Sequence, residues 1–162
     1  MNEILAVYIT ATIAALIAIW GLIYQRNTAR RHTTVERISN MESNPEMIEA
    51  RKLFIELAKS PGDLARWAEA DQEQTEQAFA IAHVLNNYEL MSIGIKNGII
   101  DYEIFRSWHK TSAINFWYHG APFVMRIRER VGNNMIYNEF EELVGWLKGD
   151  KKPPRRRFGL FF

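Results

Sequence analysis

The 162-residue chain carries 20 Lys and Arg against 19 Asp and Glu, so its formal net charge is only +1. Such a balance lacks the overall basicity that is typical of nucleic-acid-binding domains. Because cysteine is absent, disulfides, thiolate zinc sites and a cysteine nucleophile are excluded. The start of the chain is strongly apolar, and the roughly 138 residues that follow it are enough for one domain.

An uncharged stretch from Ile4 to Tyr24 opens the chain. As an α-helix it would be about 31 Å long, which matches the roughly 30 Å hydrocarbon core of a bilayer. A cleavable signal would begin with positive charge and end with small residues, whereas here Glu3 precedes the stretch and Trp20 lies near its end. A buried core helix of a soluble protein is rarely this long without charge. We therefore predict a transmembrane anchor at residues 1–24.

The charges on either side of this stretch predict its orientation. No Lys or Arg precedes it, whereas several arginines follow it closely. Positive charge is retained in the cytoplasm, so we predict a single-pass protein of the inner (cytoplasmic) membrane with its N-terminus outside and its C-terminus in the cytoplasm. The side chains expected at the membrane interfaces are Tyr8, Trp20, Tyr24, Arg26, Arg30 and Arg31.

A row of small residues runs along one face of the predicted anchor. Its members, spaced four residues apart, are Ala6, Thr10, Ala14 and Ala18. A second helix backbone could approach such a row closely, which would allow a homo-oligomer associated through the anchor. The favoured interpretation is that alanine is simply common in membrane spans.

Helical signals continue after the anchor. In segment 25–43 a weak pattern of residues alternately four and three apart is typical of one helical face. We predict a juxtamembrane helix or linker there. A new helix start follows, because Asn44 can cap and Pro45 suits the first helical position. From this helix start onward, the sequence predicts a helical cytoplasmic domain over residues 44–147.

The central element of this domain is expected to be a helix from about Glu73 to Asn97, apolar around most of its circumference. Asp101 can cap the next helix, and Gly120 and Pro122 should bend or break it. No alternation of apolar and polar residues indicates a strand. The predicted fold class is all-α, with one N-terminal transmembrane helix followed by a cytoplasmic helical bundle.

Standard catalytic and metal-binding motifs are not found, so we predict neither a cofactor nor a metal site. One polar cluster stands out on the central helix, where His83, Asn86 and Glu89 follow at three-residue spacing. In a catalytic interpretation Glu89 acts as acid or base and His83 carries the proton. The favoured interpretation is that these groups bond to neighbouring backbone or Arg side chains inside the fold without catalysis.

The end of the chain, residues 148–162, is a basic-aromatic tail. An anionic membrane surface would attract its positive charges, and its aromatic end could insert at the interface. A protein partner, the chain's own domain and nucleic acid are the alternatives, with nucleic acid the least favoured. The residues expected to make the contact are Lys151, Lys152, Arg155, Arg156, Arg157, Phe158, Phe161 and Phe162.

The segment AIAHVLNNYELMSIGIKNGIIDYEIFRSW resembles the bacterial and phage family catalogued as domain of unknown function 4760. The resemblance is carried by ARKLF, an Asn-x-Tyr-Glu step at 86–89, Ile-Gly-Ile at 93–95, Gly-Ile-Ile-Asp at 98–101, Trp108 and the late YNEFEELVGWL. It covers about Arg30 to Lys148 and leaves the tail outside. It implies an N-terminal membrane segment and a helical cytoplasmic portion, and it transfers no catalytic residue.

The leading functional hypothesis is a membrane-anchored protein whose helical domain is an interaction or regulatory module, in phage exclusion or bacterial defence. Its expected partners are membrane lipid and an unidentified protein. A membrane-tethered hydrolase or nucleotide-responsive enzyme using the His83, Asn86, Glu89 cluster is the first alternative. Nucleic-acid binding through the tail is the second. An enzyme is the less favoured class.

Overall fold

The computed structural model describes residues 2–154, and throughout this range it consists of helices and connecting turns without a strand. The prediction of an all-α fold is confirmed for this part of the chain. In order, the elements are α1 (Asn2–Ser43), α2 (Pro45–Lys59), the short 3-10 helices η1 (Leu64–Ala68) and η2 (Ala70–Gln72), α3 (Glu76–Lys96), α4 (Tyr102–Val131) and α5 (Asn138–Lys148).

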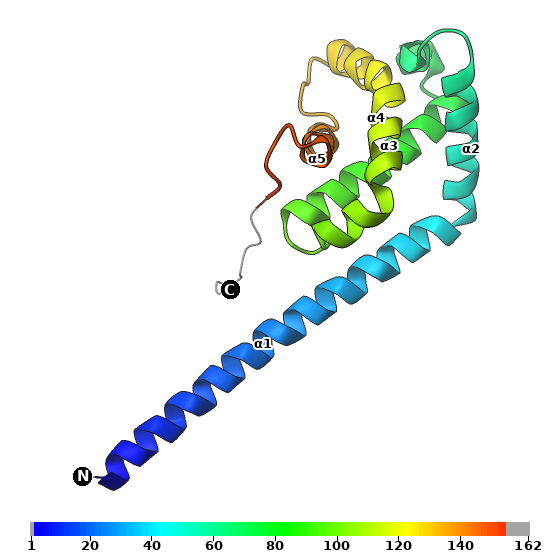
Figure 1. The fold of residues 1–162 in the computed structure, drawn as a ribbon. Helices are drawn as coiled ribbons and strands as arrows, with labels where there is room; N and C mark the ends of the chain where they lie inside the picture. The colour runs from blue at the N-terminus through cyan, green and yellow to red at the C-terminus, as the bar shows by residue number, and fades with distance from the viewer. Residues whose placement is uncertain (1, 155–162) are drawn as a thin grey trace.

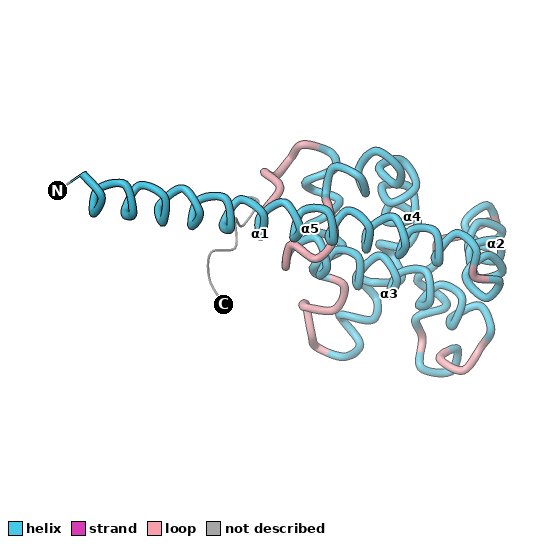
Figure 2. The backbone as a smooth tube through the Cα atoms, turned by 90° about the horizontal axis from the view of Figure 1, so that it is seen from below, coloured by secondary structure: helices cyan, strands magenta, loops and turns pink. Residues whose placement is uncertain are grey.

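The long helix α1 dominates the shape of the molecule. Its 42 residues give a length of about 63 Å. The N-terminal half extends alone, while the other helices gather beside the C-terminal half (Figure 1). A view from below shows the same division, with α1 crossing the domain toward α2 (Figure 2). Segment 25–43 is therefore a continuation of the apolar helix rather than a flexible linker.

Polar side chains cap the starts of α2 and α3, at Asn44 as predicted and at Thr75, which the sequence did not single out. Asn44 accepts a hydrogen bond from the backbone N–H of Met47 at 3.1 Å and separates α1 from α2. Thr75 accepts from the N–H of Ala78 at 3.2 Å, so α3 begins at Glu76 rather than near Glu73. In each case the side chain satisfies an N–H that the first helical turn would leave without a partner.

The core forms around α3, which is covered by α2, α4 and α5. Tyr88 lies at its centre, with its ring stacked on Phe140 at 4.9 Å between centroids. Phe54 of α2 meets Phe116 of α4 edge to face at 5.0 Å. The predicted packing of the central helix on several sides is thus observed.

Helix α4 runs without interruption from Tyr102 to Val131 and contains Pro122. The expectation that Gly120 and Pro122 would bend or break it is wrong in one respect, because the helix does not end there. Buried side chains on both sides of the proline, Trp117 and Phe123, hold the segment against the core. This packing outweighs the backbone hydrogen bond that a proline removes.

Candidate functional site: the joint between the long helix and the domain

The two halves of α1 have opposite surroundings. After residue 30, one face of the helix is buried against the domain through Thr34, Ile38 and Met41. Before that point the helix is apolar and exposed, and no part of its most apolar 18-residue window is buried. It is long and apolar enough to cross a membrane. We call the contact between the second half of α1 and the domain the joint.

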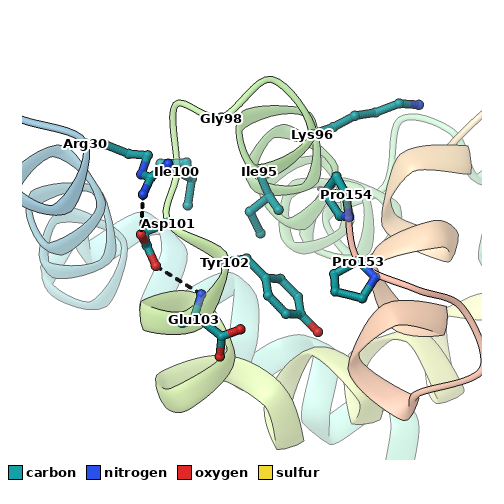
Figure 3. A pocket seen from close by; sticks show the side chains of 10 residues that line it. All are labelled: Arg30, Ile95, Lys96, Gly98, Ile100, Asp101, Tyr102, Glu103, Pro153 and Pro154. Carbon is teal, nitrogen blue, oxygen red and sulfur yellow. Dashed lines mark hydrogen bonds and ion pairs between the residues drawn. The ribbon is translucent and has the colours of Figure 1, made fainter. Parts of the chain in front are cut away.

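At one end of the joint, Arg30 forms an ion pair with Asp101 at 3.0 Å. Asp101 is 4% exposed, and its Oδ1 also accepts the N–H groups of Glu103 and Ile104 at 3.1 and 3.3 Å, which caps α4. The backbone N–H of Asp101 donates to Thr34 Oγ1 at 2.8 Å. Figure 3 shows Arg30 reaching from α1 to this carboxylate beside the start of α4. One aspartate therefore joins two helices and begins one of them.

At the other end of the joint lies a polar network from three helices. Arg51 of α2 donates to both carboxylate oxygens of Glu42 at 2.9 Å and to the carbonyl of Met41 at 2.6 Å. His109 of α4 lies against the same carboxylate, with Nε2 at 3.7 Å from Oε1. The other ring nitrogen of His109 lies 3.3 Å from Ser112 Oγ. This network ties the end of α1 to both neighbours.

Burial lowers the pKa of His109 below its ordinary value, although the Glu42 carboxylate opposes that effect. A depressed folded-state pKa means that the stabilising contribution is fully present above the unfolded value of about 6.5 and is lost as the pH falls toward the folded-state value. We expect the free energy of unfolding of the wild type to fall relative to His109→Phe, which keeps an aromatic ring without the titration, between pH 7 and pH 5. Urea unfolding in detergent micelles, followed by tryptophan fluorescence, measures the difference. A difference that does not change with pH would contradict the assignment.

The predicted His83, Asn86, Glu89 cluster is divided by the fold. His83 and Asn86 line a cavity of about 290 Å³ between α1, α2 and α3. Glu89 lies on another face of α3, where its carboxylate accepts the backbone N–H groups of Glu139 and Phe140 at 3.4 and 2.6 Å. Six residues along a helix turn a side chain well away from the first position. Glu89 therefore holds the first turn of α5, as the structural interpretation of the cluster expects.

Burial raises the pKa of Glu89, against the opposing effect of the two N–H donors from α5. A raised folded-state pKa means that the stabilising contribution is fully present below the unfolded value of about 4.3 and is lost as the pH rises through the folded-state value. We expect the wild type to lose stability relative to Glu89→Gln as the pH rises from 4 to 7. Unfolding curves of both proteins across this range test it, and an opposite slope would show that the N–H donors outweigh burial.

The predicted interface residues are exposed along the first half of α1. Tyr8, Trp20 and Tyr24 project outward, and the rings of Trp20 and Tyr24 stack at 6.0 Å. Arg30 also pairs with Asp101 in the joint. The predicted association row is exposed as well, and the hydroxyl of Thr10 donates to the carbonyl of Ala6 at 2.9 Å. That bond satisfies the one polar side chain of the row within its own helix.

The first part of the tail packs beside the domain. After α5 ends, the backbone N–H groups of Gly149, Asp150 and Lys151 all donate to the carbonyl of Gly145, at 3.1, 2.9 and 3.1 Å. Pro153 and Pro154 then line a cavity of about 180 Å³ that also borders Arg30, Gly98 and Tyr102 (Figure 3). Lys151 and Lys152 are exposed there. The remaining predicted tail contacts, Arg155, Arg156, Arg157, Phe158, Phe161 and Phe162, lie outside the described residues.

A third hollow, of about 340 Å³, lies between α2 and α4 and is lined by apolar and polar side chains together. The residues that line this hollow are Phe54, Ile55, Ala58, Lys59, Ser112, Asn115, Phe116 and His119. Within residues 2–154, no group of three or more acidic, histidine or cysteine side chains could hold a metal ion.

Comparison with known families decides the classification. The family model described as "Domain of unknown function (DUF4760)" matches residues 8–146. The chain belongs to this family. The match confirms the resemblance, although it begins earlier than expected and includes most of the apolar half of α1. The DUF4760 match also ends before the tail, as predicted. Searches of curated proteins and of solved structures gave no match.

Proposed function

We propose that this DUF4760 protein is a single-pass protein of the inner membrane, with the first half of α1 crossing the bilayer and the helical domain in the cytoplasm. The observation that carries the proposal is the complete exposure of an apolar helix for which the described domain offers no cover. Water would solvate this helix poorly, whereas lipid tails would solvate it well. The inclusion of this segment in the family match supports the proposal, because the helix is then part of what the family shares.

The proposed orientation rests on the charges beside the apolar stretch. No basic residue precedes it, and Arg26, Arg30 and Arg31 follow it, which favours retention of the following domain in the cytoplasm. The engagement of Arg30 by Asp101 does not remove this argument, because orientation is chosen during insertion, before the domain has folded.

Detergent phase separation tests the membrane proposal. The full-length protein should enter the detergent-rich phase, and a variant lacking residues 2–24 should remain in the aqueous phase. A full-length protein that stays aqueous would contradict the proposal.

The domain itself, we propose, acts by binding another protein at or near the membrane. The hollow between α2 and α4 supports this role, because it combines an exposed apolar side chain, Ile55, with polar groups at its rim. A setting in phage exclusion or bacterial defence stays a prediction.

The hydrolase alternative requires Glu89 and His83 in one site, and no observation favours it, since Glu89 is engaged by α5.

Photo-crosslinking in cells tests the interaction. A photoreactive residue at Ile55 should give a discrete crosslinked product, whereas one at Val131, which is also exposed but lies at the end of α4, should not. Equal patterns at the two positions would contradict the assignment of this surface.

A further inference from the structure

We propose that the turn between α3 and α4 is a second membrane contact, in which Ile99 inserts among the head groups of an anionic lipid surface. The turn comprises residues 97–101. This inference rests on the proposed membrane position of α1. It differs from the predicted lipid contact of the tail, because it involves another segment of the chain.

The joint determines how far this turn lies from the bilayer. Arg30 and Thr34 both bind Asp101, the last residue of the turn, at 3.0 and 2.8 Å. Arg30 follows Tyr24, the end of the apolar stretch, by only six residues, which is about 9 Å along an unbroken helix. The turn is therefore held at the outer edge of the head-group region, which is roughly 5–8 Å deep on each side of the hydrocarbon.

The turn is built so that one isoleucine packs inward and the other projects outward. The N–H groups of Ile99 and Ile100 both donate to the carbonyl of Gly94, at 2.9 and 3.0 Å. Gly98 has a φ of +71°, which a glycine adopts without strain. A Cβ at Gly94 would lie 2.6 Å from Ile100 Cγ1, so Ile100 packs closely on α3. Ile99 is left 57% exposed on a turn whose backbone is fixed.

Charged side chains of both signs lie near this turn, and the acidic ones next to Asp101 are paired. Lys151 and Lys152 are exposed, as is Asp150 before them, and they precede Pro153 and Pro154, which line the same cavity as Gly98 (Figure 3). Asp101 is neutralised by Arg30, and Glu103 pairs with Arg106 at 3.4 Å. An anionic leaflet would attract the two exposed lysines, while the apolar tip enters the interface.

Phe79 provides a matched control on the same helix. It is 57% exposed, as Ile99 is, but it lies near the start of α3. Because 17 helical residues separate it from Lys96 at the other end, the two ends are about 26 Å apart. A contact that depends only on exposed apolar surface would involve both residues, whereas the proposed contact involves Ile99 alone.

The absence of native cysteine permits a direct test with the full-length protein. The variants Ile99→Cys, Phe79→Cys and Ile13→Cys are labelled with an environment-sensitive fluorophore and placed in nanodiscs of phosphatidylethanolamine and phosphatidylglycerol. Lipids carrying a spin label at the head group or deep in the acyl chain then quench the fluorescence. We expect head-group quenching at position 99 to be at least threefold stronger than at position 79, and deep quenching to be strongest at position 13.

The possible outcomes distinguish a failure of the proposed turn contact from a failure of the proposed membrane span. Equal quenching at positions 99 and 79, with strong deep quenching at position 13, would overturn the turn contact and leave the membrane span intact. Absence of deep quenching at position 13 would overturn the proposed function itself. Circular dichroism of each labelled variant verifies that its helix content matches the wild type, so that a folding defect is not taken for a lost contact.

Discussion

Replacing Asp101 with alanine is expected to destabilise the protein by about 3–5 kcal/mol, as removal of one partner from a buried ion pair does. The variant leaves Arg30 without its carboxylate and removes the cap of α4. It also releases the carboxyl group that connects α1 to the domain. Urea unfolding of the full-length protein in detergent micelles, followed by tryptophan fluorescence, measures the change in free energy.

A neighbouring carboxylate provides the control. Glu103 lies in the same first turn of α4, but its ion pair with Arg106 is exposed, so Glu103→Ala should cost less than about 1 kcal/mol. The double variant Arg30→Ala, Asp101→Ala should be more stable than Asp101→Ala alone, because no unpaired buried charge remains. A loss of less than 1 kcal/mol in Asp101→Ala would contradict the role given to the joint.

Two arginines in the apolar half of α1 are expected to remove the protein from the membrane. Each charge at the centre of a span costs about 2.5–3.5 kcal/mol on insertion scales, so Ile13→Arg with Ile17→Arg costs about 5–7 kcal/mol. The measurement is the fraction of protein that remains with membranes after an alkaline carbonate wash. We expect the wild type to remain and the double variant to be washed out or degraded.

Arginines placed further along the same helix provide the control. They distinguish the cost of placing charge in lipid from a general effect of added charge. Val35 is exposed but lies beyond the apolar stretch, beside the domain. Two arginines at 35 and 39 should leave the protein in the membrane fraction. Retention of the Ile13, Ile17 variant at the wild-type level would show that lipid does not solvate this half of α1.

The helices themselves could be predicted from the sequence because their signals are local. Asn44 and Asp101 each bind an N–H two or three residues away, so the capping residue and its partner appear in one short segment. The apolar stretch that opens α1 is also a local signal. The all-α class and the approximate helix boundaries follow from such patterns.

The site could not be predicted in the same way, because its contacts are distant in sequence. Asp101 binds Thr34 across 67 positions, and no spacing rule connects Glu42, Arg51 and His109. The three-residue spacing of His83, Asn86 and Glu89 indicated one cluster, but α5 lies on the side of α3 that carries Glu89. The continuity of α4 through Pro122 likewise depends on packing from other helices.

Accessibility of single cysteines in living cells tests whether the first half of α1 crosses the inner membrane. Asn2→Cys, Ile13→Cys and Lys52→Cys are treated with a maleimide that cannot cross membranes. We expect position 2 to react in intact cells, position 52 to react only after the inner membrane is permeabilised, and position 13 to react in neither case. Reaction at position 52 in intact cells, or reaction at position 13 with the aqueous reagent, would contradict this expectation.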